Sequence, residues 1–93
     1  MKVRVKLSIE GNNIDEVIDA PSAEALLVIA RDRVAKSLGW KGMIVKAMAP
    51  VTFAQEAVKL YNKEYGKSEP LPQSATDFVE FGKRTGNLTV IDE

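Results

Sequence analysis

The fold is decided by residues 2–20, which read KVRVKLSIEGNNIDEVIDA. Apolar and polar side chains alternate over residues 2–10, and this period of two is typical of a strand with one buried face. Residues 14–20 are also rich in β-branched side chains and predict a second strand. The Gly-Asn-Asn between the two segments contains residue types that tolerate the positive φ angles of a tight turn. The pattern therefore predicts an antiparallel hairpin.

The expected register of this hairpin follows from a turn centred on residues 12–13. Such a turn places Leu7 opposite Ile18 on one face and Lys6 opposite Asp19 on the other. Apolar side chains then meet across the strands on the buried face, and opposite charges meet on the exposed face.

A long helix is expected after the hairpin. Ser22 is the expected N-cap, and Glu24 lies where a carboxylate interacts favourably with the positive end of the helix dipole. Gly39 is a natural stop, because glycine favours the left-handed conformation that ends many helices. The apolar side chains at helical spacing form the expected core-facing stripe, namely Ala23, Leu26, Leu27, Ala30, Val34 and Leu38.

The middle of the chain predicts a strand and a second helix. Residues 42–49 are an apolar run that ends at Pro50, and they predict a third strand. Thr52 and Gln55 have the spacing of a capping box, which predicts a helix that begins at Thr52 and ends near Gly66.

The last third of the chain predicts a loop, a short helix and a strand. Two prolines within residues 67–73 indicate the loop. Ser74 with Asp77 caps a short helix that carries Phe78 and Phe81 and is closed by a glycine at position 86. Residues 88–91 predict a short final strand.

These elements follow the order ββαβααβ and predict one α+β domain over residues 1–93. The expected architecture is a small mixed sheet with helices packed mainly on one face. The element order resembles that of the ubiquitin-like β-grasp fold, which implies a last strand that runs parallel to the first in mid-sheet. A ferredoxin-like α/β sandwich is the alternative, because a mixed sheet with helices on one face accepts several strand orders.

Composition argues against an enzyme. The chain has no cysteine and no histidine, which removes the thiolate nucleophile, the zinc–sulfur site and the commonest general base. No catalytic residue, cofactor or metal ion is therefore expected. The carboxylates of Asp15, Glu16 and Asp19 do not form a calcium loop, and on a strand Glu16 points away from the other two.

Charge and hydropathy limit the partners. Lys plus Arg and Asp plus Glu both number 13, so the chain has no positive excess of the kind that nucleic-acid-binding proteins usually carry. The longest apolar run, residues 25–30, is far shorter than a membrane span. A cytoplasmic protein with no membrane partner is the expectation, and the charge balance does not favour a nucleic-acid partner.

Trp40 is the residue that most suggests a binding surface. It lies in Gly39-Trp40-Lys41-Gly42, and an aromatic beside a cation is common at protein interfaces. The same tryptophan could instead cover the core at the end of the long helix, and the usual burial of tryptophan favours this interpretation. Leu71, between two prolines, is a second candidate contact.

The sequence thus favours a non-catalytic protein-interaction or accessory module, whose partner is another protein or a second copy of the chain. The alternative is a small nucleic-acid-binding protein. Its contacts would be the basic side chains of the first strand and of the last helix, namely Lys2, Arg4, Lys6, Lys83 and Arg84.

Overall fold

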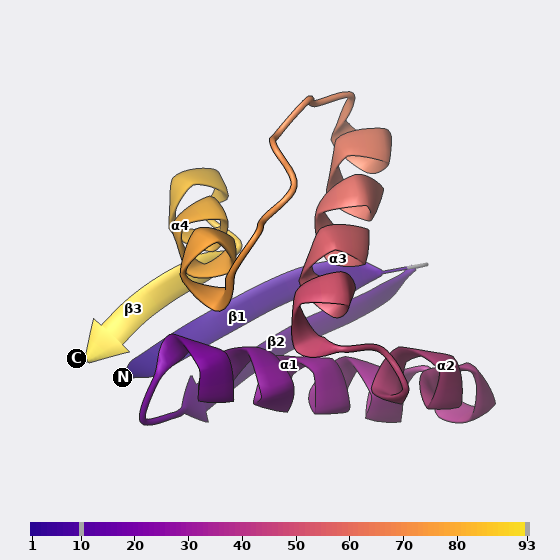
Figure 1. The fold of residues 1–93 in the computed structure, drawn as a ribbon, viewed down its shortest axis with the longest axis horizontal. Coiled ribbons are helices and arrows are strands. Elements are labelled where there is room, and N and C mark those ends of the chain that lie inside the picture. The colour runs from indigo at the N-terminus through magenta and orange to yellow at the C-terminus, as the bar shows by residue number, and fades with distance from the viewer. Residues whose placement is uncertain (10, 93) are drawn as a thin grey trace.

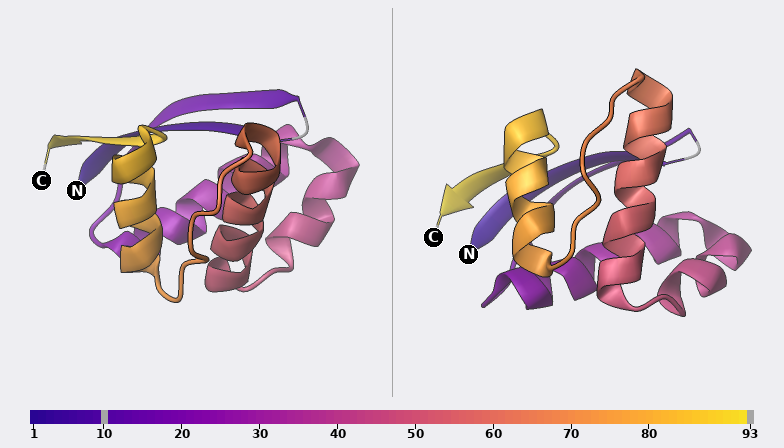
Figure 2. Two further views of the ribbon diagram at one scale, coloured as in Figure 1. Left: turned by 90° about the horizontal axis from the view of Figure 1, so that it is seen from above. Right: turned by 45° about the horizontal axis from the view of Figure 1, so that its top comes forward.

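The chain forms three strands and four α-helices in the computed structural model, which describes residues 1–9 and 11–92 (Figure 1). The α+β class expected from the sequence is confirmed. The helices lie together on one face of the sheet, and the other face is open to solvent (Figure 2). In chain order the elements are β1 (Lys2–Ile9), β2 (Asn12–Asp19), α1 (Ala23–Ser37), a short 3₁₀ helix η1 (Gly39–Lys41), α2 (Gly42–Lys46), α3 (Pro50–Tyr65), α4 (Ala75–Thr85) and β3 (Leu88–Asp92).

The β1–β2 hairpin is confirmed, but its expected register is wrong by four residues. Leu7 lies opposite Ile14, and Lys6 lies opposite Asp15. Asn12 and its neighbour already belong to β2, so the turn comes earlier than expected, next to Gly11 with its φ of 82°. Because four is an even number, the same side chains still face the core and the same side chains still face solvent.

β3 pairs with β1 in the antiparallel direction, so the parallel last strand implied by the β-grasp resemblance is wrong. The strand order is β2-β1-β3, and the described sheet is antiparallel rather than mixed. The backbone of Asn87 accepts a hydrogen bond from the amide of Lys6 at 2.7 Å. β3 therefore begins beside Val5 and Lys6 of β1. From there it runs toward Lys2, in the direction opposite to that of β1.

α1 and α4 begin and end as their sequences predict. The hydroxyls of Ser22 and Ser74 each accept a hydrogen bond from a backbone amide three residues later, at 3.1 Å in both cases. α4 ends at Gly86, which has a φ of 81°. Leu38 closes α1, and Gly39 follows with a φ of 63°.

The third strand expected over residues 42–49 is wrong, because Gly42–Lys46 form the helix α2 and residues 47–49 connect it to α3. Gly42 explains why a helix fits here: a Cβ at this position would lie 1.8 Å from the carbonyl oxygen of Ala35. Only glycine lets α2 pack this closely against α1. A short apolar run is ambiguous between strand and helix, and the contact with α1 decides between them.

α3 begins at Pro50, two residues before the predicted start. Proline suits the first turn of a helix because it has no amide hydrogen to leave unpaired. The capping box of Thr52 and Gln55 is wrong, since the side-chain amide of Gln55 instead donates to the carbonyl of Pro72 at 3.0 Å. The predicted end at Gly66 is confirmed, with a φ of 63°.

The core joins the inner face of the sheet to α1, α3 and α4. Leu26 and Leu27 of α1 are fully buried, as are Val3 of β1 and Val58 of α3. The rings of Phe53 and Phe78 pack with their centroids 6.4 Å apart. Within the described part of the chain, no helix combines the length and the apolar character that crossing a bilayer requires.

Candidate functional site

Trp40 lies on the surface with 77% of its area exposed, so the interpretation of this residue as a lid over the core is wrong. Gly39 turns the chain out of α1 with its positive φ, and the side chain that follows points away from the core. The ammonium nitrogen of Lys41 lies 5.8 Å from the centre of the Trp40 ring, which is within the range of a cation–π contact. An exposed indole beside a cation is the arrangement expected of a contact residue.

A groove of about 400 Å³ lies beside Trp40, between α1, α2 and α3. The lining side chains come from the end of α1, from η1, from α2 and the turn after it, and from α3. Most of the lining is apolar. The lining residues are Val34, Leu38, Trp40, Lys41, Ile44, Val45, Met48, Phe53, Glu56, Ala57 and Leu60.

Two further apolar side chains of α2 are exposed, Ile44 in the lining of the groove and Met43 in the lining of a second hollow between α1 and α2. Met43 is 77% exposed and Ile44 is 64% exposed, more than any other large apolar side chain in the described chain apart from Trp40. The sequence analysis did not select them, because it placed both in a strand. For Ile44 the signal was present in the spacing, since Trp40, Ile44 and Met48 are four residues apart, a spacing typical of one helical face, and all three line the groove.

α2 is held in position at both of its ends. At its start, the missing side chain of Gly42 permits direct contact with the backbone of Ala35. Two residues after its end, the guanidinium of Arg31 donates a hydrogen bond to the carbonyl of Met48 at 3.0 Å. The groove wall is therefore preformed, which lowers the ordering cost of binding.

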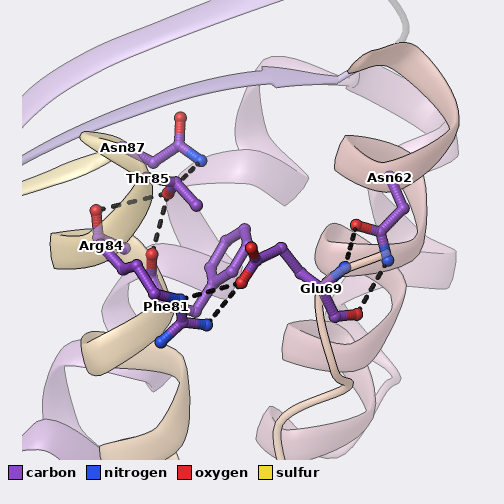
Figure 3. Close-up of polar contacts among 7 residues, drawn as sticks. Asn62, Glu69, Phe81, Arg84, Thr85 and Asn87 are labelled. Atoms are coloured by element: carbon purple, nitrogen blue, oxygen red, sulfur yellow. Dashed lines mark hydrogen bonds and ion pairs between the residues drawn. The ribbon is translucent and has the colours of Figure 1, made fainter. Parts of the chain in front are cut away.

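Leu71 lies in a different part of the molecule from Trp40. It belongs to the loop between α3 and α4, and together with Arg84 of α4 it lines a smaller hollow. That loop is fastened by Asn62, whose side-chain amide accepts from the backbone amide of Glu69 and donates to its carbonyl, both at 3.0 Å (Figure 3). Leu71 is exposed, but the structure does not bring it to the groove.

The basic residues of β1 face solvent on the open side of the sheet, where carboxylates lie among them. The guanidinium of Arg4 donates two hydrogen bonds to the carboxylate of Asp15, each 2.8 Å long. In the register of the hairpin, Lys2 lies opposite Asp19, and Lys6 lies opposite Asp15. The positive row expected from the sequence is therefore largely balanced by β2.

The basic residues of α4 are separate from that row, because α4 packs beneath the other face of the sheet (Figure 2). The guanidinium of Arg84 bonds to the carboxylate of Glu69, with the shortest contact at 2.6 Å (Figure 3). The Lys83 ammonium lies 3.6 Å from a carboxylate oxygen of Glu80. The five basic residues considered for nucleic acid do not form one surface.

The carboxylates of β2 point to opposite faces, as expected for a strand. Asp15 is on the open face with Arg4, whereas the carboxylate of Glu16 accepts from Arg33 of α1 at 2.7 Å. A polar hollow of about 660 Å³ lies beside that second pair. Among residues 1–9 and 11–92, no charged side chain is buried and no cluster of acidic residues could hold a metal ion.

Comparison of the chain with models of known protein families gives no match, and neither do comparisons with curated proteins or with solved structures. Its function must therefore be inferred from its own residues and their geometry. Of the surfaces described, the groove beside Trp40 combines apolar lining, concave shape and exposed aromatic and aliphatic side chains. These are the features of a site that binds another molecule.

Proposed function

We propose that this protein is a non-catalytic protein-interaction module, and that it binds its partner through the face formed by Trp40, Met43, Ile44 and the adjoining groove. The observation that carries the proposal is the exposure of these three neighbouring apolar side chains. Leaving them in water has a free-energy cost that burial in a complex would remove. Tryptophan is also prominent among the residues that dominate binding energies at interfaces.

The chemistry of the chain supports binding over catalysis. With neither histidine nor cysteine, a catalytic base or nucleophile would have to be a lysine, a carboxylate or a hydroxyl. Such groups need burial or close charged neighbours to become reactive. Arg4 and Asp15, the pair that raises the pKa of the guanidinium and lowers the pKa of the carboxyl, lie exposed on the open face of the sheet and outside the groove. The cytoplasmic location predicted from the sequence remains part of this proposal.

The test is capture of a partner by the immobilised protein from the cells in which it is made. We expect a protein to be retained by the wild type and lost with Trp40→Ala. Val17→Ala is the matched control, because Val17 is a half-exposed apolar side chain on the open face of the sheet, away from the groove. The control should retain the partner as well as the wild type does.

Trp40 also supplies a direct signal. It is the only tryptophan in the chain, so tryptophan emission reports on this face alone. Binding of the captured partner should shift the emission to shorter wavelength and protect the ring from quenching by iodide. Equal recovery of partners by wild type and Trp40→Ala, or no recovery by either, would contradict the proposed function.

Nucleic-acid binding is less well supported than protein binding. On the open face, the guanidinium of Arg4 is hydrogen-bonded to the carboxylate of Asp15. The two lysines of β1 lie opposite aspartates of β2. Binding to phosphates would have to overcome this local balance. A filter-binding titration with RNA and DNA at low salt should therefore give no saturable retention, and retention that falls steeply with salt would favour this alternative.

A further inference from the structure

We propose that the free edge of β2 is a second binding site, at which an extended segment of another protein pairs as a fourth strand of the sheet. This inference goes beyond the proposed function, because no described residue of β2 lines the groove beside Trp40. It rests on the direction of the backbone groups of β2, on the hollow beside this strand and on the charges that the strand carries.

The backbone groups of β2 point outward at every second residue. β2 is an edge strand, because in the described sheet it pairs with β1 alone. The amide of Ala20 donates to the carbonyl of Met1 at 2.8 Å, and the hairpin register places these two residues opposite each other. Hydrogen-bonded pairs recur at every second residue of an antiparallel ladder, so the even-numbered residues of β2 bond to β1. The amides and carbonyls of the odd-numbered residues therefore point toward the free edge, at Asn13, Asp15, Val17 and Asp19.

The edge of β2 is long and regular. All eight residues of β2 are in register with β1, whereas β3 has five residues and a register shift near its end. A bulge or a short length commonly protects the edge of a sheet from pairing, and β2 has neither. Residues 13–19 span about 20 Å at about 3.4 Å per residue, which is enough to pair with five or six residues of a ligand.

A polar hollow of about 660 Å³ lies along this edge, between β2 and α1. Residues 13–16 of β2 line it together with Arg33, Lys36 and Ser37 of α1, and no described residue of β1 does. The hollow is therefore on the side of β2 where an added strand would lie. Alternate side chains of that strand would enter the hollow, and the others would lie on the open face of the sheet.

The charges of β2 argue against a second copy of this chain as the added strand. Residues 12–19 contain three carboxylates and no cation. The twofold antiparallel registers with the greatest overlap place Glu16 opposite its own copy, Asp15 opposite its own copy, or Asp15 opposite Asp19. Like charges directly opposite each other destabilise a pair of strands. For the same reason we expect the ligand to carry no acidic side chain on the open face.

The experiment begins with a selection of random seven-residue peptides, displayed between flexible glycine-serine linkers, on the Trp40→Ala variant. This variant removes the anchor of the groove, so the enriched peptides report on other surfaces. We expect enrichment of peptides that lack acidic residues at alternate positions and that bind the wild type as well as the variant. On binding, the outward amides of Asn13, Asp15 and Val17 should become protected from hydrogen exchange, which NMR measures residue by residue.

Methylation of the peptide backbone tests the strand pairing directly. An N-methyl group at a position whose amide faces β2 should weaken binding about tenfold or more, the scale of a lost hydrogen bond, and a methyl group at the next position should not. The loss should therefore alternate along the peptide with a period of two. This scan uses the wild-type protein, so its result does not depend on the folding of a variant.

Val17→Pro is the matching change in the protein. Proline has no amide hydrogen, and the amide of Val17 points outward, so the variant loses a donor at the edge without losing a bond to β1. It should bind the enriched peptide about tenfold more weakly. Val17→Ala is the control, because it shortens the same side chain and keeps the amide, and it should bind as the wild type does.

Four results would overturn this inference. They are no enrichment of peptides, a methylation scan without alternation, unchanged exchange at the outward amides when the peptide is bound, and a dimer in sedimentation that protects these amides without any peptide. None of them affects the groove, because the proposed function is tested by the Trp40-dependent capture of a partner. Likewise, a failed capture with an alternating methylation scan would leave the β2 site as the binding surface of the protein.

Discussion

Among single residues, Arg4 and Asp15 form the pair whose titration can be followed. Hydrogen bonds from the Arg4 guanidinium lower the pKa of the Asp15 carboxyl below its ordinary value, and partial desolvation opposes this shift. The charges of Arg4 and Lys6 lower the pKa further. Because the pKa is lowered in the folded protein, the pair stabilises the fold above the unfolded-state pKa of about 4. That stability is lost as the pH falls through the folded-state pKa.

We therefore predict that Arg4→Gln raises the pKa of Asp15 toward its ordinary value. The shift can be read from the side-chain carboxyl carbon of Asp15 in an NMR titration. Wild type and Arg4→Gln should differ in unfolding free energy at neutral pH and converge in acid. Lys2→Gln is the control, since Lys2 lies opposite Asp19 rather than Asp15. An unchanged Asp15 titration in Arg4→Gln would show that the two side chains do not pair in solution.

Leu26 tests which face of α1 is buried. Its side chain is fully buried in the core, so Leu26→Ala should lower the unfolding free energy by about 2–5 kcal/mol. Val17→Ala, at a half-exposed position on the open face, should change it by less than about 0.5 kcal/mol. Urea unfolding followed by circular dichroism measures both changes. Similar losses for the two variants would contradict the assigned orientation of α1.

For the elements, Gly42 reports on the contact between α1 and α2. In an open helix, replacing glycine by alanine stabilises by about 1 kcal/mol. Here the added methyl group would meet the Ala35 backbone, so Gly42→Ala should instead destabilise by about 1–3 kcal/mol or more. The sign of the change in urea unfolding is therefore the test. Stabilisation by alanine would mean that α2 does not pack closely against α1.

The loop between α3 and α4 depends on Asn62. Its side chain makes two hydrogen bonds to the backbone of Glu69, and the carboxylate of Glu69 in turn holds Arg84. Asn62→Ala should cost about 1–3 kcal/mol and speed hydrogen exchange at the Glu69 amide. Asn62→Asp keeps the acceptor and loses the donor, so it should protect that amide better than alanine does. Equal exchange rates in wild type and Asn62→Ala would contradict this role.

At the scale of the whole molecule, one hydrophobic cluster joins the sheet to three helices. We predict a single cooperative unfolding transition, because the buried apolar side chains of the described residues form this one shared cluster. Far-ultraviolet circular dichroism follows the helices, and near-ultraviolet circular dichroism follows the packed aromatic rings of Phe53, Phe78 and Phe81. The two signals should give the same midpoint and slope in urea. Separated transitions would show that the helices and the aromatic core unfold independently.

Several features of the fold could be predicted because they depend on residues close together in the sequence. The strands β1 and β2 are recognised from a period of two in their apolar side chains. The starts of α1 and α4 are recognised from a serine whose hydroxyl accepts a hydrogen bond from the amide three residues later. The ends of α3 and α4 need only a glycine that adopts a positive φ, at Gly66 and Gly86. Local patterns of this kind identify which residues face inward before any partner element is known.

The candidate site was only partly predictable. Trp40 and Lys41 were selected for their residue types, but their exposure depends on how the chain leaves α1 at Gly39. Met43 and Ile44 were assigned to a strand, because an apolar run of this length is compatible with either kind of element. The groove itself combines side chains from three helices, and no short stretch of sequence contains that information.

The sequence by itself determined the α+β fold class, the inward faces of β1, β2 and α1, and the absence of imidazole and thiol groups. The tertiary structure alone decided that residues 42–46 are helical, that β3 runs antiparallel to β1, and that Trp40 faces solvent. The physical reason is the range of the interactions involved. Periodicity and capping act within a few residues, whereas the contact of Gly42 with Ala35 and the pairing of Lys6 with Asn87 exist only after distant segments have packed together.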